Sequence, residues 1–431
     1  MSRSQSIFIG IDIGTSGVRA CAINENEELL QSCHTPLPAP VIRQDSITQS
    51  PAFWWLATYQ VLGALLRRID ASQVLGISVN GTSGTVLACD IDGTPLAPAL
   101  MYNDSSCRQQ AAAIKPVAPN TSAAHGSSSG LAKLLYLQQT FPQAAYLLHQ
   151  ADWIVGKLCG RFDVSDENNA LKSGYDPVNG CWPEWLAQLN LNAGRLPDIV
   201  PPATSVATVK KRLLKKHKLN PSCRVISGTT DSVAAFIATG AHRPGDAVTS
   251  LGSTLVLKIM TDKPLCDPAA GIYSHKLGDY WLAGGASNTG GAVLRHYFSQ
   301  QQIDRMTPLI KPSAATGFNY YPLISPGERF PFNDPELSPR LEPKADSEVE
   351  FFQGMLEGIS RIELQGYQKL QQLGAAFPTH IDTAGGGSKN NGWTEIRAKM
   401  LNTPVKRANF SEACYGSALL AKRGIYPELI S

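Results

Sequence analysis

Two apolar runs joined by a short polar turn stand at the start of the chain and constrain its fold more than any other stretch. The first run, Ile7–Ile13, is rich enough in β-branched residues to be a buried strand, and Val18–Ile23 returns as a second strand. The turn Gly14–Gly17 combines backbone freedom at its glycines with two hydroxyl side chains. Such a turn can wrap backbone N–H groups around an anion.

Asp12 lies at the end of the first predicted strand. A buried carboxylate is costly there unless a cation or several donors compensate for its charge. A bound divalent metal supplies that compensation, so Asp12 is a candidate metal ligand. An ordinary hairpin whose turn is satisfied internally is the alternative.

The same pattern occurs a second time, more than halfway along the chain. The apolar start of Ala247–Thr254 meets a Gly/Ser/Thr turn, and Leu255–Ile259 returns as an apolar strand. Two phosphate-type turns, each near the start of about half the chain, predict a duplicated architecture with a cleft between the halves.

The size and charge of the chain exclude several classes of protein. Its 431 residues suffice for two domains, and 43% hydrophobic with 17% charged residues is typical of a globular enzyme. A formal charge of +3 is too small to predict a nucleic-acid or membrane partner. The only basic cluster, residues 210–216, is interpreted as the solvated face of a helix.

The cysteines and the N-terminus predict a cytoplasmic protein. The nine cysteines include no Cys-x-x-Cys pair and are odd in number, so reduced thiols are expected. The polar start Met1–Ser6 does not resemble a signal peptide, and no apolar stretch approaches the length of a membrane span.

A loop-rich region marks the expected domain boundary. Residues 173–202 contain five prolines and precede a basic helix and a short strand. We therefore expect an N-terminal domain over residues 1–225 and a C-terminal domain over residues 226–431, whose last helix is able to pack on the N-terminal domain. The oligomeric state is expected to be a monomer or a homodimer.

Other polar turns follow predicted strands. Asp231 ends Gly228–Asp231 and starts a predicted helix, where it can cap the helix and also serve in catalysis. Ser83, in the turn Gly81–Thr85, is a candidate for binding a hydroxyl group. The turn Gly385–Asn390 opens a helix and allows close approach of backbone to a nucleotide.

Taken together and in order, these stretches resemble the FGGY family of carbohydrate kinases. The resemblance spans nearly the whole chain and rests on five motifs: Asp12–Ser16, Gly228–Asp231, Ser250–Thr254, Gly284-Gly285 with Asn288, and Gly385–Gly387 with Asn390. It implies an α/β fold of two ribonuclease H-like domains with a central cleft, as in the actin-like ATPase superfamily that includes hexokinases and heat-shock chaperones.

The resemblance also implies the roles of individual residues. Asp231 would be the catalytic base, and Asp12 would act in catalysis, hold Mg²⁺ and, with Thr15, Ser83 and Asp231, contact the sugar. ATP would be bound by two sets of residues, the phosphate turns Thr15, Ser16, Gly17, Gly252, Ser253 and Thr254, and the adenosine-side residues Gly285, Gly385, Gly386, Gly387, Asn390 and Trp393. The expected partners are thus ATP and a small sugar.

A nearer resemblance is to the short D-ribulose kinases of cyanobacterial and plant type. It rests on Gly81–Thr85, Tyr273–Leu277 and Gly327–Pro331, although Asn80 stands where an acidic residue is expected. The tryptophan-rich motif of longer xylulose kinases is absent, and only Asn103-Asp104 keeps part of it. D-ribulose is therefore the expected phosphate acceptor.

Three alternatives remain open at this point. The first is the same chemistry on D-xylulose or another ketose or polyol, because specificity depends on few side chains. The second is a sugar or nucleotide sensor without catalysis, and the third is an actin-like or chaperone-type ATPase that acts on a protein. Asp12 and Asp231 argue against a sensor, and the Ser83 turn fits a sugar better than a protein partner.

Overall fold

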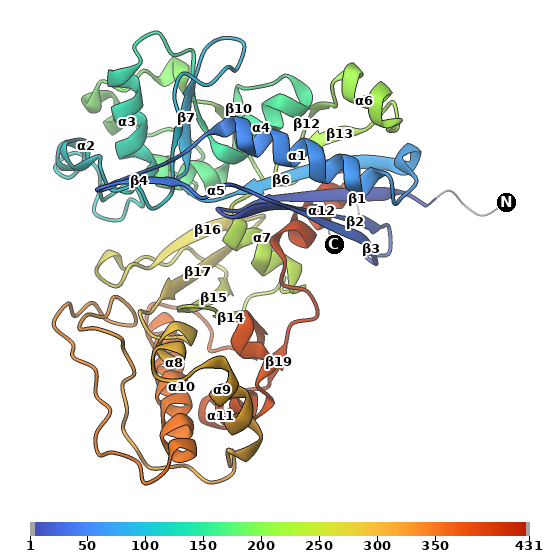
Figure 1. Cartoon of the computed structure of the whole chain (residues 1–431). Coiled ribbons are helices and arrows are strands. Elements are labelled where there is room, and N and C mark those ends of the chain that lie inside the picture. The colour runs from blue at the N-terminus through green and yellow to red at the C-terminus, as the bar shows by residue number, and fades with distance from the viewer. Residues whose placement is uncertain (1–4, 428–431) are drawn as a thin grey trace. The chain divides into compact units, whose positions relative to one another are not determined.

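The computed structural model of the chain describes residues 5–427 (Figure 1), so the first four residues of the polar N-terminal stretch lie outside it. The chain forms two compact units. The first unit runs to Ala238 and takes up the chain again from Glu412, and the second unit is Thr239–Ser411. The expected boundary after residue 225 therefore lies inside the first unit.

The first unit is built on a six-stranded mixed sheet in the order β12-β13-β6-β1-β2-β3. β1 pairs antiparallel with β2 and parallel with β6, and β6 pairs parallel with β13. The opening apolar runs thus form neighbouring strands, as predicted. The strands are β1 (Ile7–Ile13), β2 (Gly17–Asn24), β3 (Leu29–Pro36), β6 (Val74–Gly81), β12 (Ser205–Thr208) and β13 (Arg224–Ile226).

Two helices from opposite ends of the chain pack on this sheet. Helix α1 (Pro51–Leu66) contacts β2 and β3, and α12 (Ala413–Ile425) contacts β1, β2 and β6 as well as α7 (Asp231–Ala238). The approach of α12 is close because Gly10 in β1 has no side chain. A Cβ atom at that position would overlap the carbonyl oxygen of Cys414.

A second sheet and several helices complete the first unit. Its five strands lie in the order β4-β5-β8-β7-β9, and β10 pairs separately with β11. The strands are β4 (Val41–Arg43), β5 (Ser46–Gln49), β7 (Val86–Cys89), β8 (Ala99–Leu100), β9 (Tyr146–His149), β10 (Val164–Asp166) and β11 (Asp198–Val200). The helices are α2 (Arg108–Ile114), α3 (Gly130–Thr140), α4 (Gln150–Cys159), α5 (Glu167–Ala170) and α6 (Lys211–His217), with short 3-10 turns η1 (Ala71–Gln73), η2 (Leu171–Ser173), η3 (Glu184–Leu189) and η4 (Ala193–Arg195).

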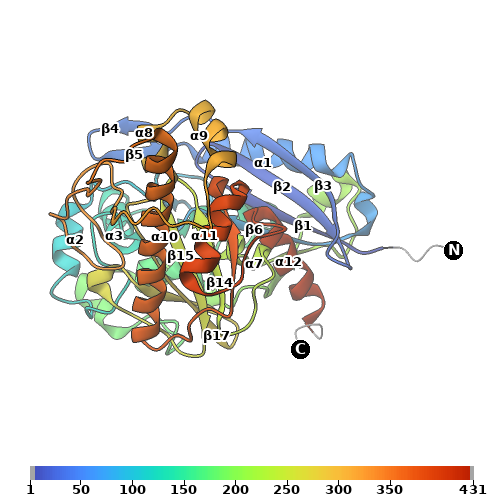
Figure 2. The same cartoon turned by 90° about the horizontal axis from the view of Figure 1, so that it is seen from below.

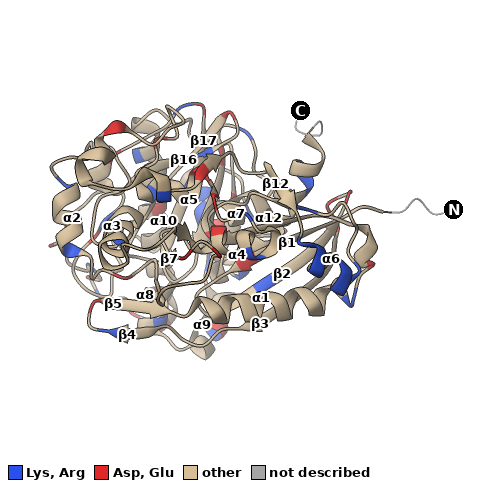
Figure 3. Ribbon diagram, turned by 90° about the horizontal axis from the view of Figure 1, so that it is seen from above, with Lys and Arg blue, Asp and Glu red and all other residues tan. Residues whose placement is uncertain are grey.

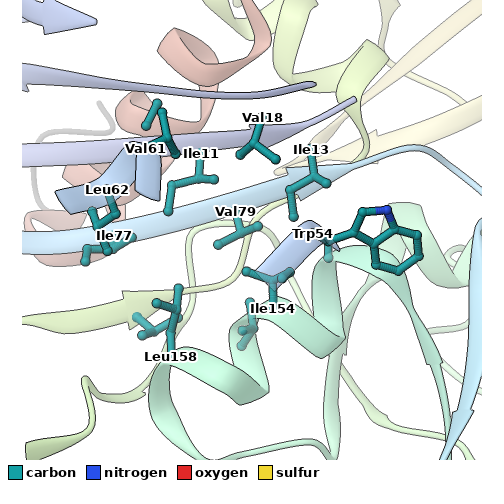
Figure 4. Close-up of a cluster of buried hydrophobic side chains, with 14 of the residues drawn as sticks. Ile11, Ile13, Val18, Trp54, Val61, Leu62, Ile77, Val79, Ile154 and Leu158 are labelled. Carbon is teal, nitrogen blue, oxygen red and sulfur yellow. The ribbon is translucent and has the colours of Figure 1, made fainter. Parts of the chain in front are cut away.

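Apolar side chains of the strands and helices form the core of the first unit. Ile11 and Ile13 of β1 and Val79 of β6 belong to the same buried cluster as Trp54 of α1 and Ile154 of α4 (Figure 4). Each of these five side chains has an exposed fraction of 0%. Burial on this scale holds the end of β1, where Asp12 lies, in a fixed position.

The second unit repeats the arrangement of the first. Its sheet has the order β16-β17-β15-β14-β18-β19, in which β14 pairs antiparallel with β15 and parallel with β18, just as β1 pairs with β2 and β6. The strands are β14 (Asp246–Leu251), β15 (Leu255–Thr261), β16 (Tyr273–Leu277), β17 (Tyr280–Ala286), β18 (His380–Ala384) and β19 (Val405–Arg407). The duplication predicted from the two phosphate-type turns is therefore present in the strand pairing.

Two helices of the second unit pack together against this sheet. The long helix α10 (Glu348–Gln372) contacts β15, β17 and α11 (Asn391–Leu401), and α11 contacts β19 (Figure 2). The other helical segments are α8 (Gly291–Tyr297), α9 (Gln300–Met306), η5 (Pro268–Ala270), η6 (Thr307–Leu309) and η7 (Gly386–Lys389). No helix within residues 5–427 combines the length and the apolar composition needed to cross a bilayer.

Candidate active site

Three strands of the first unit end at one edge of its sheet and bring candidate residues together there. Asp12 in β1 lies opposite Asn80 in β6, and Gly81 at the end of β6 forms a parallel bridge to Thr230. Asp231 follows Thr230 directly. The carboxyl ends of parallel strands are a common place for ligands in α/β sheets, and this edge carries two of the carboxylates singled out from the sequence.

The two carboxylates are close enough to influence each other. Asp12 is buried, with an exposed fraction of 7%. Burial raises its pKa to about 7, and the negative charge of Asp231 contributes to the same shift, while Arg19 opposes it. A buried carboxyl beside a second one, with a single cation opposing the shift, is an electrostatic environment that favours a positive ligand.

Asp231 is the first residue of α7 and not its cap. The first backbone N–H groups of the helix, from Val233 and Ala234, donate to the carbonyl oxygen of Thr230. The Asp231 carboxylate accepts the N–H of Ser232 at 2.7 Å. The expected capping position is therefore occupied by Thr230, because the helix begins at Asp231, one residue earlier than the sequence suggested.

The turn that contains Ser83 is held rigidly from several sides. The side-chain oxygen of Gln150 accepts both the N–H and the hydroxyl of Thr82 at 2.9 Å, and the hydroxyls of Thr82 and Thr85 lie 2.6 Å apart. Gly84 has a φ of 82°, which permits the tight turn. The buried hydroxyl oxygen of Ser83 has no hydrogen-bond partner among the described residues. It is therefore available to a ligand hydroxyl.

Lys133 of α3 binds the backbone of this turn. Its ammonium donates to the carbonyl oxygens of Gly84 at 2.6 Å and Met101 at 2.8 Å. Burial lowers the pKa of Lys133 to about 7, and Asp104 opposes this shift. Burying a lysine ammonium costs free energy of folding. The hydrogen bonds of Lys133 therefore join the Ser83 turn to the segment after β8 at the expense of some stability.

The turn after β1 is a tight loop whose residues differ in exposure. The N–H of Gly14 donates to the carbonyl oxygen of Gly17 at 3.0 Å, and Gln49 donates to the carbonyl oxygen of Thr15 at 3.2 Å. Ser16 is exposed. The structure thus places Thr15, Ser16 and Gly17 three to five residues beyond Asp12 on the same edge of the first unit's sheet.

The second unit contains a cavity of about 600 Å³. Six of the residues that the sequence singled out as nucleotide-binding line it, namely Gly252, Ser253, Gly386, Gly387, Asn390 and Trp393. Asn390 caps α11 by accepting the N–H of Trp393 at 2.9 Å, and the indole of Trp393 donates to Ser360 at 3.0 Å. These hydrogen bonds fix the glycine-rich turn against the helix that follows it.

Three other predicted nucleotide-binding residues of the second unit do not line this cavity. Gly285 lies within β17, where a side chain would collide with the ring of Phe330. Gly385 has a φ of 81° and packs against Leu251, and Thr254 lies at the far end of the β14–β15 turn. Their roles in binding ATP remain predictions.

Sequence reasoning did not single out several residues that the structure places at these sites. In the first unit they are Gln150 and Thr230, whose Nε2 and Oγ1 atoms are buried without a partner among the described residues. In the second unit Arg295 donates to the hydroxyl of Ser253 at 3.1 Å, and Lys389 lines the cavity. Lys389 follows the glycine run and was recognisable, whereas the contact of Arg295 depends on the fold.

The residues of the first unit fit a divalent cation held by few protein ligands. Within residues 5–427 no group of three or more His, Cys, Asp or Glu side chains is arranged to hold a metal ion. The raised pKa of Asp12 nevertheless shows a carboxyl whose negative form needs compensation. Mg²⁺ is typically bound by one or two carboxylates together with waters and substrate phosphates, which matches this donor set.

The fold and these two sites define a two-domain α/β protein of the actin-like ATPase type. Comparison with family models matches residues 7–238 to the N-terminal domain and residues 247–425 to the C-terminal domain of the FGGY family of carbohydrate kinases. The chain belongs to this family and is a carbohydrate kinase.

Individual relatives are distant but span nearly the whole chain. A xylulose kinase of Staphylococcus epidermidis is 23% identical over 446 residues, covering 98% of this chain and 88% of the relative. A gluconokinase of Bacillus subtilis is 22% identical over 458 residues, covering 98% and 87%. The crystal structure of a xyloylose kinase from Brucella ovis is 24% identical with a TM-score of 0.87, covering 97% of this chain and 90% of the other. These relatives include kinases named for two different sugars, and no ribulose kinase is among them.

Proposed function

We propose that this kinase transfers the γ-phosphate of ATP to the terminal C5 hydroxyl of a ketopentose, D-ribulose, yielding D-ribulose 5-phosphate. The observation that carries the proposal is the pairing of Asp12 and Asp231 at the edge of the sheet where β6 leads into the turn with the unpartnered Ser83 hydroxyl. Phosphoryl transfer requires a positioned hydroxyl, a base for its proton and compensation of phosphate charge. The same edge of the first unit offers groups for each of these tasks.

In this proposal Asp231 accepts the proton of the sugar hydroxyl as the new O–P bond forms. A carboxylate of ordinary basicity suffices because the proton moves late in a loose transition state. Ser83 orients the sugar through a hydrogen bond. Asp12, together with substrate phosphates, would hold Mg²⁺, which neutralises charge on the phosphates when bound.

ATP binding is assigned to the second unit. The cavity there has the volume expected for a nucleotide-sized ligand. Gly252 and Ser253 would contact phosphates, and Gly386, Gly387 and Trp393 would line the adenosine side. The backbone of a glycine-rich turn can approach a ligand closely, which supports this assignment. The reaction requires both units to bring their substrates together in line during turnover.

The choice of D-ribulose is supported by one of the three stretches that suggested it. The turn Gly81–Thr85 lies at the site itself. Glu328, from the stretch Gly327–Pro331, is buried and accepts the hydroxyls of Ser287 and Tyr321, so this stretch holds the second unit together. D-Xylulose is the second candidate acceptor because similar proteins are named xylulose kinases.

A substrate panel tests the proposal. ADP release with Mg²⁺ and ATP is measured for D-ribulose, L-ribulose, D-xylulose, L-xylulose, glycerol and D-gluconate. We expect the highest kcat/KM with D-ribulose. A maximum of kcat/KM with D-xylulose would show that D-xylulose is the phosphate acceptor, with the proposed chemistry unchanged. If no sugar stimulated ADP release, the result would support a sensor. Turnover stimulated by peptide alone would support a chaperone-type ATPase.

Replacing Ser83 by alanine should weaken sugar binding without weakening the fold. Loss of one neutral hydrogen bond predicts a rise in the KM for the sugar of up to about tenfold, with the KM for ATP unchanged. Because the hydroxyl has no internal partner, the thermal unfolding midpoint should not fall. Thr82→Val is the matched control, since its hydroxyl is bonded to Thr85 and Gln150 and its loss should lower that midpoint. An unchanged sugar KM in Ser83→Ala would contradict the assignment.

Replacing Asp12 by asparagine should stabilise the metal-free protein at high pH. The pKa of this carboxyl is about 7 in the folded chain, against an ordinary value of 3.8, so the folded state binds the extra proton between these two pH values. The free energy of unfolding of the wild type should therefore fall as pH rises from about 4 to 7, by an upper bound of about 4 kcal/mol from this residue. The Asp12→Asn variant has no carboxyl at this position, so its free energy of unfolding should not show this fall.

Urea unfolding in EDTA at pH 5 and pH 8 measures the effect. The stability advantage of Asp12→Asn over the wild type should be larger at pH 8, while its sugar-dependent turnover should be strongly reduced. If the difference in the free energy of unfolding between variant and wild type were equal at both pH values, burial would not raise the pKa of the Asp12 carboxyl.

A further inference from the structure

A second cavity in the first unit lies away from the residues assigned to phosphoryl transfer. It has a volume of about 560 Å³ and is lined by the end of α1, the segment Asp70–Ser72 and the end of α6. Asp70–Ser72 immediately precedes β6, whereas Gly81, beside Asp12 and Thr230, ends it. At about 3.3 Å per residue, the length of β6 separates the two places by roughly 25 Å.

Three of the ten residues that line this cavity are cationic, and one is a carboxylate. Arg67 follows α1, and Lys216 and Lys218 come from α6 and its C-terminus. None of these three side chains makes an ion pair or a side-chain hydrogen bond with another residue in the described range 5–427. The one carboxylate in the lining, Asp70, accepts hydrogen bonds from the N–H and hydroxyl of Ser72. Figure 3 shows the concentration of Lys and Arg on α6. We call this cavity the basic pocket.

A histidine at the wall of the basic pocket has an unused donor or acceptor. The Nε2 atom of His217 is buried and has no hydrogen-bond partner among the described residues. Its ring packs edge-on to Tyr59 at 5.4 Å, and the ammonium of Lys216 lies 5.0 Å from the centre of the same Tyr59 ring. Burial lowers the pKa of His217, and the charges of Lys216 and Arg67 add to this shift. The imidazole therefore lies close to two uncompensated cations.

Helix dipoles account for only part of this arrangement. Cations stabilise the C-terminal end of a helix, and both α1 and α6 end here. This helix-dipole effect does not require a cavity, however, and it provides no hydrogen-bond partner for Nε2 of His217. A cluster of cations around a buried, unpaired imidazole becomes favourable when an anion lies among them, because the anion compensates their charges and accepts hydrogen bonds from all of them.

We propose that the basic pocket is a second binding site, specific for a phosphate-bearing anion of metabolite size and separate from the phosphoryl-transfer site. Arg67, Lys216 and Lys218 supply charge-assisted donors, and the protonated imidazole of His217 supplies one more. A concave site of this volume matches a small molecule better than an extended polymer. Phosphate groups match because a guanidinium and two ammonium groups bind them well.

The experiment follows the imidazole of His217 directly, so that binding at the ATP site does not interfere. The full chain is labelled at its histidines, and the signal of His217 is assigned by its disappearance in His217→Gln. Pyrophosphate, inorganic phosphate and D-ribulose 5-phosphate are titrated separately at constant ionic strength. We expect a saturable shift of the His217 signal, and a rise of its pKa in the bound state. The charged and aromatic groups that face this ring are Arg67 and Tyr59 of α1 and Lys216 of α6.

Two double variants with the same change of charge separate a built site from general surface charge. Arg67→Met/Lys216→Met removes two lining cations and should weaken binding about tenfold or more. Lys211→Met/Lys215→Met removes two exposed cations of α6 that do not line the pocket, and should leave the affinity within about twofold. Unchanged thermal unfolding midpoints verify that both variants fold.

The ligands distinguish the source of the phosphate. Tighter binding of D-ribulose 5-phosphate than of inorganic phosphate identifies a phosphorylated sugar, and tighter binding of pyrophosphate identifies a polyphosphate; either result supports the proposal. Absence of a His217 shift at about 10 mM of every probe would overturn it. Equal weakening of ligand binding in the two double variants would also overturn the proposal. That result would indicate that binding depends on the net charge of α6 and not on the residues that line the pocket.

Discussion

Replacing Asp231 by asparagine is expected to lower kcat for sugar phosphorylation by about 10²–10⁴-fold, the contribution typical of a positioned general base. Asparagine has nearly the same shape but cannot accept the hydroxyl proton. The residue is the first of α7, where its carboxylate accepts the N–H of Ser232, so the substitution should not unfold the helix. The KM for ATP should remain close to that of the wild type because the nucleotide residues are assigned to the second unit.

Coupled ADP release with and without the best sugar measures this effect, and Asp163→Asn is the matched control. Asp163 is also an aspartate of the first unit, but it is exposed in an ion pair with Arg161. The control should keep nearly full activity. Retention of more than about a tenth of kcat in Asp231→Asn would be incompatible with the role of general base.

Replacing Arg397 by methionine should cause the largest loss of stability in the second unit, about 3–5 kcal/mol. The guanidinium forms two hydrogen bonds with the Glu363 carboxylate, at 2.6 and 2.7 Å, and a third with the hydroxyl of Thr383. Both charged side chains are almost completely buried, with exposed fractions of 0% and 1%. Removal of Arg397 leaves the negative charge of Glu363 buried without a cation.

Arg305→Met provides the control in the same unit. Arg305 is paired with Glu348 at 2.6 Å, but both side chains are about half exposed, so its loss should cost at most about 1 kcal/mol. Urea unfolding and hydrogen exchange of α10 and α11 report the difference. If both variants lost equal stability, the buried pair would contribute no more than a surface pair. In Arg397→Met/Glu363→Gln, part of the loss should be recovered because the unpaired charge is absent.

The sequence contained enough information for the strands and turns that carry the catalytic candidates. Asp12 and the turn after it were recognisable because an alternating or continuous apolar run must end where glycine and hydroxyl residues begin. The repetition at β14 and β15 was visible for the same reason. Local rules also located helix α11 after the turn Gly385–Asn390, since the signals for the turn and for the helix lie close together in the sequence.

Long-range relations could not be predicted in this way. Gln150 holds the Ser83 turn from 68 positions away, and Lys133 does so from 49. A single sequence contains no signal that pairs such residues. The same limit explains the boundary of the units: the small residues of α12 indicated close packing, but only the fold shows that Gly416 packs on Ala234 of α7 and Gly10 on Cys414.

The placement of α12 also determines the order in which the units can be completed during synthesis. β1 is translated before the second unit, yet the helix that covers it, residues 413–425, is translated after that unit. All of Thr239–Ser411 precedes α12 in the chain, so the second unit can reach its full set of contacts while the older first unit still exposes one face of its sheet. Loss of this helix would therefore damage the unit that contains β1, and a nascent first unit must remain soluble without the helix until it is translated.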